Sequence, residues 1–442
     1  MTLNTLMNTR FEQAKTLANA LMSEHGEASG AAVAGELLEA VCGLSAEDRL
    51  AFERFLTFGF QPPAEPLRIA AQSYLASATP ATAARLAEAA DPPRQEILRR
   101  MNMAPGGTAA LIALREDISR NLRDEPALKL LDADLKHLFA SWFNRGFLEL
   151  RRVDWQTPAA VLEKLIAHEA VHAMEGWPDL RRRLAPDRRC FAYFHPVLPE
   201  EPLIFVEVAL VEGLAGAVQP LLDQAVDAEA ARQRADRADT AIFYSISNCQ
   251  KGLRGVSFGN LLIKQVVEEL KAELPRLTRF STLSPIPGFR HWLDRHLAGE
   301  PDNALAQMLA ADRWWLDGGK SEALRQPLLA QCAAYLTRRP TRVEPADPVA
   351  RFHLGNGARL ERINWLGNTD ARGFQESYGV MANYLYDPAT IVGNHEAFAR
   401  DGTVVRSADV DALMKVNDLD NPHGYRQREP SSIPGHVTTI HS

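Results

Sequence analysis

The amino-acid sequence predicts an α+β protein in which an all-helical domain (residues 1–185) precedes a mixed domain of strands and helices (residues 186–442). Three observations predict this fold class. The chain has 442 residues, enough for two or three domains with cores of their own. Up to about residue 185, apolar residues recur at helical spacing and β-branched runs are scarce. Beyond it, short β-rich runs alternate with amphipathic stretches, which is typical of helices packed on a sheet.

Helix signals follow one another through the first domain. The apolar residues of the stretch 128–142 keep the i, i+3, i+4 spacing of a helix with one buried face. Ser45, followed by Asp48, predicts a helix N-terminus. Prolines at 62–63, 80 and 92–93 separate the helical segments. We expect a helical bundle or array, and no fixed-period repeat runs through it.

The second domain carries the strand signals. Short apolar, β-rich runs predict strands at 190–194, 203–210, 241–246, 358–366 and 378–386. The polar stretch 222–239 predicts a surface helix or loop, and residues 258–274 predict an amphipathic helix.

Composition excludes several classes of protein. Hydrophobic residues make up 46% and charged residues 24%, which argues against a disordered chain or a coiled coil. The net charge of -7 argues against a general nucleic-acid binder. No window reaches the ~20 apolar residues that cross a bilayer, and the N-terminal segment is amphipathic, unlike a secretory signal. Four cysteines without a CxxC pair predict neither a thiolate zinc site nor a disulfide framework. We expect a cytoplasmic protein.

The most conspicuous motif is HExxH at residues 168–172, within a predicted helix. His168 and His172 on one helical face could hold zinc, with Glu169 as general base. A third ligand at the usual spacing is missing, and Glu175 lies too close to His172 to serve. So short a pattern also arises by chance. Helix-face histidines without a metal are therefore the favoured interpretation, and a zinc protease is the minor alternative.

A glycine-rich turn between the strand at 241–246 and the following helix predicts an anion site. Backbone N–H groups and the positive end of a helix dipole favour phosphate, and two cationic side chains add charge. The pattern Arg254-x-x-Ser257-x-Gly259 is close to the (R/Q)xxGx(G/A) loop of GNAT acetyltransferases, which holds the coenzyme A pyrophosphate. A plain tight turn is the alternative. The candidate residues are Lys251, Gly252, Leu253, Arg254, Gly255, Val256, Ser257, Phe258 and Gly259.

Two further segments carry polar groups at turns. Ser284 begins the run Ser-Pro-Ile-Pro-Gly-Phe, whose prolines make the loop after a strand rigid. It is not a GxSxG elbow, so an activated serine nucleophile is not implied, and a turn-capping serine is the alternative. His353 precedes a Gly-Asn-Gly turn, which is expected to leave its ring accessible for acid–base chemistry. A structural histidine remains the commoner case.

In their residues and in their order along the chain, these segments resemble malonyl-CoA decarboxylases. The resemblance runs through most of residues 155–390, and it is most specific in the two motifs that contain Ser284 and His353. It implies an N-terminal helical, oligomerising domain and a C-terminal catalytic domain of the GNAT (acetyltransferase-like) α/β fold. It also implies a homodimer or homotetramer, a role in fatty acid metabolism, no metal at the HExxH motif, and a bacterial, cytosolic type of member.

By this resemblance Ser284 and His353 occupy the positions of the family's catalytic serine and histidine, and Tyr386 that of a tyrosine near the site. The loop Lys251–Gly259 would bind the coenzyme A phosphates, although Ser257 stands where mammalian members have a glutamate. The implied reaction converts malonyl-CoA into acetyl-CoA and CO2 without a cofactor.

The chemistry of that reaction assigns roles to the candidate residues. Loss of CO2 leaves an enolate of the thioester, so we expect Ser284 to position the substrate and His353 to protonate the carbanion. A CoA-dependent acyltransferase that uses the same loop is the alternative enzyme. A catalytically inactive domain that senses malonyl-CoA is the alternative without chemistry, and the joint presence of Ser284, His353 and Tyr386 argues against it.

Overall fold

The computed structural model of the chain describes residues 3–23, 27–223, 227–256, 262–298, 303–339 and 346–420. Its contacts divide the chain into two compact units. The first unit comprises Met1–Val208 with Ser245–Pro275, and the second comprises Ala209–Tyr244 with Arg276–Ser442. The predicted boundary near residue 185 stays a prediction.

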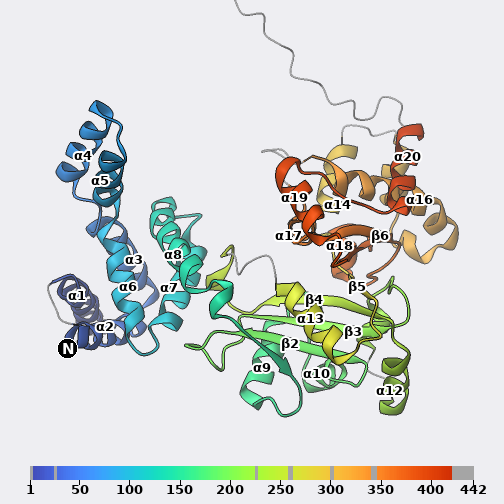
Figure 1. Cartoon of the computed structure of the whole chain (residues 1–442), viewed down its shortest axis with the longest axis horizontal. Helices are drawn as coiled ribbons and strands as arrows, with labels where there is room; N and C mark the ends of the chain where they lie inside the picture. The colour runs from blue at the N-terminus through green and yellow to red at the C-terminus, as the bar shows by residue number, and fades with distance from the viewer. Residues whose placement is uncertain are drawn as a thin grey trace, which may run out of the picture. The chain divides into compact units, whose positions relative to one another are not determined.

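Helices occupy the first unit up to residue 142, as predicted (Figure 1). Ser45 caps the third helix by accepting a hydrogen bond from the Asp48 N–H, and prolines stand at or just before the starts of the next three. The helices are α1 (Leu3–Leu21), α2 (Glu27–Cys42), α3 (Ala46–Gly59), α4 (Ala64–Ala76), α5 (Pro80–Ala90), α6 (Pro93–Met103), α7 (Gly107–Asn121) and α8 (Lys129–Trp142).

Most of these helices bury one apolar face. In α8 the buried residues include Leu131, Leu135 and Leu138, at the spacing that the sequence predicts. The helix α4 differs, because none of its residues is buried. Short 3₁₀ turns η1 (Pro126–Leu128) and η2 (Arg145–Phe147) lie on either side of α8.

A sheet begins in the first unit earlier than predicted. The strand β1 (Glu149–Val153) pairs antiparallel with β2 (Arg188–Phe194), so the region before residue 186 is not all-helical. No strand signal marks this segment in the sequence, because β1 carries charges and buries only Val153. The helices α9 (Ala159–His168) and α10 (Trp177–Arg183) lie between these two strands in the chain.

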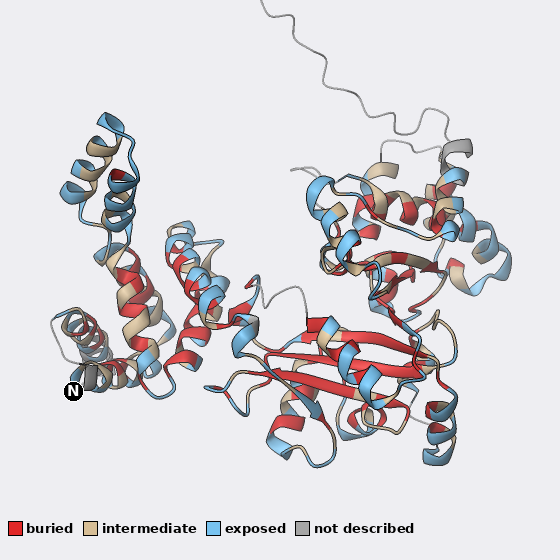
Figure 2. Cartoon of the chain, in the orientation of Figure 1, coloured by how far each residue is buried: buried red, intermediate tan, exposed pale blue. Residues whose placement is uncertain are grey.

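The two faces of β2 contact different helices, because successive side chains of a strand point to opposite faces. Cys190, Ala192 and Phe194 belong to a core cluster with residues of α9, α10 and the next strand, β3 (Ile204–Val211). Tyr193 points the other way, and its hydroxyl donates to the Leu262 carbonyl at 2.6 Å, at the start of α13 (Leu262–Glu273). Figure 2 shows these strands as almost entirely buried.

The second unit contains a mixed arrangement of strands. β4 (Thr240–Asn248), which spans both units, pairs parallel with β5 (Arg279–Thr282). β7 (Met381–Leu385) pairs antiparallel with both β5 and β6 (Arg359–Asn364). The complete strand order is β1-β2-β3-β4-β5-β7-β6. The predicted α+β class, a helical region followed by a region with a mixed sheet, is confirmed.

The remaining helices belong to the second unit. They are α11 (Gln219–Leu222), α12 (Ala228–Arg237), α14 (Phe289–Leu297), α15 (Ala304–Leu309), α16 (Gly318–Thr337), α17 (Pro348–Gly355), α18 (Ala371–Ser377), α19 (Ile391–Asp401) and α20 (Ala408–Asp420), with the 3₁₀ turn η4 (Trp314–Leu316). The predicted strands and the surface helix are confirmed, whereas residue 258, where the predicted helix 258–274 starts, lies outside the described residues.

The sequence analysis also made predictions about the cysteines and about membrane-spanning segments. All four cysteines are free thiols, and all but Cys42 are buried. Among the residues described, no helix combines the length and the apolar run that a bilayer crossing requires.

Candidate active site

Ser284 lies two residues beyond the end of β5, at the edge where β5 meets β7. Its backbone exchanges two hydrogen bonds with Ala382 of β7, at 2.8 and 2.9 Å, which fixes the start of the Pro-Ile-Pro loop. Its side chain is buried, with only 5% of the residue exposed. The sequence predicts a rigid loop after this strand, and the two hydrogen bonds fasten the start of that loop to β7.

A chain of hydrogen bonds joins Ser284 to the other two predicted site residues. The Ser284 hydroxyl lies 3.0 Å from the Nε2 atom of His353, and the Nδ1 atom of His353 lies 2.8 Å from the Tyr386 hydroxyl. At its other end, the Ser284 hydroxyl donates to the Thr282 Oγ1 atom at 2.9 Å. Because the serine proton goes to Thr282, the order assigned to the chain is Tyr386 to His353 Nδ1, and His353 Nε2–H to Ser284.

The ring of His353 is buried, contrary to the accessible ring expected from the neighbouring turn. His353 lies on α17 and is 3% exposed, because the ring packs against Tyr384 with centroids 4.8 Å apart. Burial lowers the pKa of His353 from 6.5 to about 3. Burial also raises the pKa of Tyr386 well above its usual range, so this phenol stays protonated and can donate to the imidazole.

The arrangement has the shape of a nucleophile triad but different electrostatics. In a serine hydrolase a carboxylate stabilises the imidazolium that forms when the histidine takes the serine proton. Here a neutral phenol stands in that position, and the imidazole donates to the serine. The group of Ser284, His353 and Tyr386 is therefore suited to hold and protonate an anionic substrate rather than to form an acyl-enzyme.

The predicted phosphate loop belongs to the first unit and is described up to Val256; Ser257, Phe258 and Gly259 lie outside the described residues. Its first residues form the 3₁₀ turn η3 (Lys251–Leu253). The N–H groups of Leu253, Arg254 and Val256 donate within the turn itself. An anion at this part of the loop would therefore interact mainly with cationic side chains rather than with backbone N–H groups.

Two helices of the N-terminal region hold the loop. Arg115 of α7, 3% exposed, donates to the carbonyls of Gly252 at 2.5 Å and Arg254 at 3.0 Å. The position of Gly252 admits no side chain, since a Cβ atom would lie 2.0 Å from the Ile112 carbonyl oxygen. Gly255 has φ +74°, and a Cβ atom there would lie 3.2 Å from the Cε atom of Lys136 on α8.

Sequence reasoning missed several side chains at these places. Thr282 precedes Ser284 by two residues, and the period of two along β5 could have indicated it. Tyr384 precedes Tyr386 by the same interval. Arg115 and Lys136 carried no such signal, because they lie far from the loop in the sequence and only the packing of α7 and α8 brings them to it.

The HExxH motif does not lie within a helix, so both interpretations that placed His168 and His172 on one helical face are wrong. The helix α9 ends at His168, and Glu169 has an extended backbone with ψ 110°. Its carboxylate accepts hydrogen bonds from the N–H groups of Val171 and His172, at 2.6 and 2.9 Å. These local bonds replace the next helical turn.

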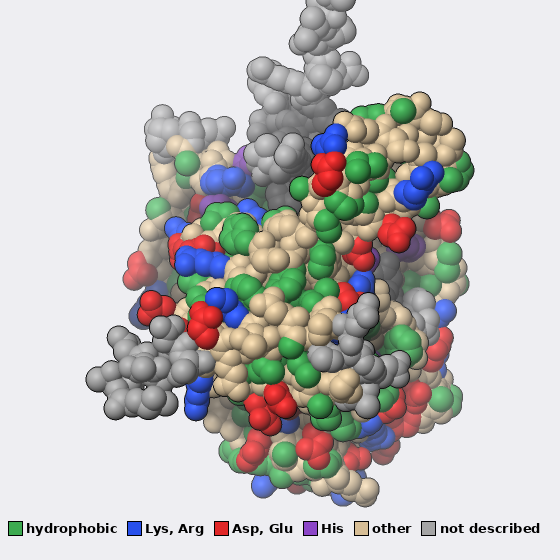
Figure 3. Space-filling view, turned by 90° about the vertical axis from the view of Figure 1, so that its left-hand side faces the viewer, with side chains coloured by type: hydrophobic (Ala, Val, Ile, Leu, Met, Phe, Trp, Pro, Cys, Tyr) green, Lys and Arg blue, Asp and Glu red, His purple; other side chains and the backbone are tan. Residues whose placement is uncertain are grey.

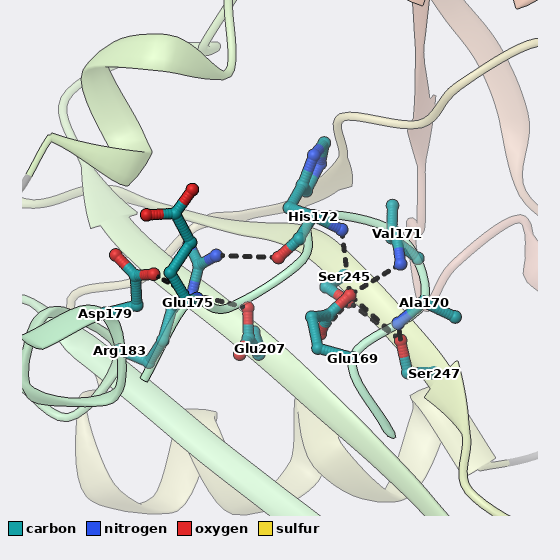
Figure 4. A network of polar contacts seen from close by, with 10 residues as sticks. All are labelled: Glu169, Ala170, Val171, His172, Glu175, Asp179, Arg183, Glu207, Ser245 and Ser247. Atoms are coloured by element: carbon teal, nitrogen blue, oxygen red, sulfur yellow. Dashed lines mark hydrogen bonds and ion pairs between the residues drawn. The ribbon is translucent and has the colours of Figure 1, made fainter. Parts of the chain in front are cut away.

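Two hydroxyl groups of β4 complete the surroundings of Glu169 (Figure 4). Ser245 lies 2.8 and 2.9 Å from the two carboxylate oxygens, and Ser247 donates at 3.1 Å. The carboxylate is thus occupied in fastening this segment to the strand. In the described ranges, no three His, Cys, Asp or Glu side chains gather as metal ligands would.

Comparisons with known proteins agree on one family. The model described as "Malonyl-CoA decarboxylase C-terminal domain" matches residues 146–423, and the model of the N-terminal domain matches residues 60–143. The mitochondrial malonyl-CoA decarboxylase of Anser anser anser is 38% identical over 336 residues, which cover 70% of this chain and 66% of the relative. That of Rattus norvegicus is 35% identical over 331 residues, covering 68% of this chain and 67% of the relative. The alignments thus span about two thirds of these relatives' own length.

Solved structures agree as well. The crystal structure of malonyl-CoA decarboxylase from Rhodopseudomonas palustris is 46% identical with a TM-score of 0.84, covering 92% of this chain and 99% of its own. The structure from Agrobacterium vitis is also 46% identical, with a TM-score of 0.84 and coverage of 91% and 99%. That from Cupriavidus metallidurans is 36% identical, with a TM-score of 0.70 and coverage of 92% and 99%.

Proposed function

The chain belongs to the malonyl-CoA decarboxylase family of carboxy-lyases, and from this premise we propose that it converts malonyl-CoA into acetyl-CoA and CO2. One observation carries the proposal: Ser284, His353 and Tyr386, which lie far apart in the sequence, are joined by hydrogen bonds of 3.0 and 2.8 Å in one buried group. The family's pattern and the chemistry of the group point to the same reaction.

The reaction needs no cofactor as electron sink, because the substrate carries one. When the C–C bond of the malonyl group breaks, its electron pair moves toward the thioester carbonyl and forms an enolate. The carboxylate must stand out of the carbonyl plane so that the breaking bond overlaps the π system. One proton must then reach the α-carbon, so each turnover takes up one proton.

The neutrality of the site favours loss of the carboxylate. Ser284, His353 and Tyr386 are each at most 5% exposed, and burial holds the pKa of His353 at about 3, so these side chains are uncharged at neutral pH. A carboxylate is costly in such surroundings, whereas CO2 is neutral and the enolate spreads its charge over the thioester. Ser284 holds the substrate by a hydrogen bond and fixes the reactive orientation.

His353 supplies the proton. The enolate formed by loss of CO2 places a negative charge beside the imidazole, and such a charge raises the pKa of a histidine. His353 therefore takes up a proton as the enolate forms and passes it to the α-carbon. Tyr386 keeps the ring in position by its bond to Nδ1.

The loop Lys251–Gly259 binds the coenzyme A phosphates in this proposal. Lys251 and Arg254 are exposed and lie on the described part of the loop, so they can reach a polyanion while the chain as a whole carries a net charge of -7. Ser257 takes the place of a glutamate of mammalian members, so we propose that the reaction does not need a carboxylate there.

The remaining proposals concern the cell and the assembly. The chain acts as a cytoplasmic homodimer or homotetramer, and its subunits associate through the helical domain. The exposed apolar residues of α4, described above as a helix without buried residues, support this.

Incubation with malonyl-CoA and no acyl acceptor tests the activity. The expected products are acetyl-CoA and CO2, which an acyltransferase would not form without an acceptor.

Ser284→Ala and His353→Ala should each lower kcat by at least about 10²-fold without unfolding the protein. Near wild-type turnover in either variant would overturn the role of that residue. Chelators should leave turnover unchanged, and a zinc-dependent reaction would contradict the proposal.

A further inference from the structure

We propose that Asp347 is a positioning residue for the reaction, because its carboxylate fastens the loop that carries Ser284 to the helix that carries His353. The inference rests on the proposed function for the roles of those two residues. Asp347 is 2% exposed, carries no motif in the sequence and touches neither reacting side chain.

The two oxygens of the carboxylate face two different elements. Oδ1 accepts from the N–H groups of Val349 and Ala350, at 3.0 and 3.2 Å, and so caps the N-terminus of α17. Oδ2 accepts from the N–H group of Gly288 at 3.1 Å, at the start of α14. Oδ2 also accepts from the Tyr335 hydroxyl of α16 at 3.2 Å. Asp347 is therefore shared between the ends of two helices.

Short, stiff segments lead from this carboxylate to the reacting groups. Gly288 is four residues from Ser284, and two of the three residues between them are proline, whose φ is fixed. His353 is six residues from Asp347, less than two turns along α17. The bond between Ser284 and His353 closes a ring whose opposite side is Asp347. A substitution of Asp347 is therefore expected to change the distance between the Ser284 and His353 side chains.

The surroundings suit a fixed anchor. Burial raises the pKa of Asp347, while its backbone and tyrosine donors act in the opposite direction. Gly288 is closely packed: a Cβ atom there would lie 2.2 Å from the Tyr335 hydroxyl oxygen and 3.3 Å from Oδ2 of Asp347. The loop therefore has little room to move away from the carboxylate.

The decisive variant is Asp347→Asn. An asparagine has a single acceptor oxygen, so whichever way its amide turns, either the cap of α17 or the bond to Gly288 is lost. We expect kcat to fall by about 10²-fold, the effect of a displacement of about 1 Å, while KM for malonyl-CoA stays near the wild-type value. The matched control is Asp370→Asn, the same change at the cap of α18, where the carboxylate of Asp370 accepts from Gly373 of that helix. It should leave kcat unchanged.

A second pair of variants tests the same geometry by crowding. Gly288→Ala should lower kcat, because the added methyl group collides with the Tyr335 hydroxyl. Tyr335→Phe in the same chain removes that oxygen and should restore much of the loss. A double variant as impaired as Gly288→Ala contradicts the proposal.

A crystal structure of Asp347→Asn separates this proposal from the proposed function. We expect the distance between Ser284 Oγ and His353 Nε2 to exceed about 3.5 Å, the limit of a hydrogen bond. Unchanged kcat, or lost kcat with the distance unchanged at 3.0 Å, would overturn the positioning role. If the wild-type chain does not decarboxylate malonyl-CoA, the proposed function fails, and the distance alone still decides whether Asp347 positions the two side chains.

Discussion

The imidazole of His353 lies in the interior of the protein, and this burial sets its protonation state at neutral pH. A histidine in an unfolded chain has a pKa of about 6.5, whereas burial lowers the pKa of His353 to about 3 in the folded protein. Between these values the unfolded chain binds a proton that the folded chain does not. The stability that depends on neutral His353 is therefore complete above pH 6.5 and is lost as the pH falls toward 3.

This sign gives a prediction for acid unfolding. From pH 7 to pH 5, His353 alone should lower the free energy of unfolding by about 2 kcal/mol. Urea unfolding of the wild type and of His353→Gln measures the contribution, since every other titrating group is common to both. The wild type should lose more stability than the variant over this range. Equal losses would show that the folded protein protonates His353 as easily as the unfolded chain does.

Single residues differ in how far the sequence could indicate them. Ser284, His353 and Tyr386 stand in motifs that resemble one family, and the structure brings them together. The alternation of side chains along β5 could have indicated Thr282. No such signal indicated Asp347 as a link between two helices, because Gly288, which its Oδ2 atom bonds, lies 59 positions away. Burial of the His353 ring also depends on Tyr384, which comes from a distant strand.

At the scale of elements, the loop that follows β4 depends on α7 and α8 as much as on its own residues. Arg115 binds two of its carbonyls, and Lys136 lies against Gly255. Within the described ranges no ion pair joins Lys136 to a carboxylate, and Lys136 is exposed. Its ammonium group is therefore available to a phosphate near the loop.

We predict that Lys136→Ala raises KM for malonyl-CoA about fivefold, equivalent to about 1 kcal/mol of lost charge attraction. With malonyl-pantetheine, which lacks the nucleotide phosphates, the variant and the wild type should have the same KM. Lys129→Ala removes the same charge two turns earlier in α8 and should change neither value. A similar rise in Lys129→Ala, or a rise with malonyl-pantetheine, would contradict a specific contact of Lys136 with phosphate.

The segment after α9 shows how a side chain can end a helix. Glu169 bonds the N–H groups of two residues ahead of it and two serines of β4. The variant Glu169→Gln places an amide donor among these donors. We predict a loss of about 1–3 kcal/mol in the free energy of unfolding, measured by denaturant titration. Glu175→Gln, a nearby exposed position, is the control and should change stability by less than about 0.5 kcal/mol. Equal stabilities of wild type and Glu169→Gln would contradict the structural role.

The elements that the sequence predicted share a simple cause. Helices with one apolar face and strands with continuous apolar runs were found where their period is regular, as in α8, β2 and β3. The elements misjudged are those fixed by partners elsewhere in the chain. β1 is charged and exists through its pairing with β2, and the end of α9 depends on hydroxyls of β4.

At the scale of the whole molecule, the proposed assembly rests on the helical domain. Ile69 and Leu75 of α4 are 55% and 83% exposed, although both are apolar. On the face shown in Figure 3, hydrophobic side chains are interspersed with acidic and basic ones. Contact with a second subunit would remove such apolar area from water.

We predict that the double variant Ile69→Glu with Leu75→Glu shifts a dimer or tetramer toward the monomer, because association would bury two carboxylates. Light scattering after size-exclusion chromatography gives the mass of the assembly. Val392→Glu on α19, at a residue 65% exposed outside the helical domain, should leave the mass unchanged. A monomeric wild type, or a double variant with the wild-type mass, would contradict association through α4.

The family models meet between residues 143 and 146, whereas the predicted boundary, which stays a prediction, lies near residue 185. The strand β1 explains part of the difference, since it starts the sheet at Glu149 without an apolar run. The compact units follow neither boundary, because the return of the chain through β4 places residues 245–275 with the N-terminal region.

The grip of α7 on the loop has a thermodynamic consequence. If subunits associate through the helical domain and the loop binds the coenzyme, both equilibria involve the same domain, because α7 holds the loop. Any free energy by which assembly strengthens or weakens coenzyme affinity must be returned, in equal amount, as a change in the subunit dissociation constant. Saturation with malonyl-CoA would then depend on protein concentration.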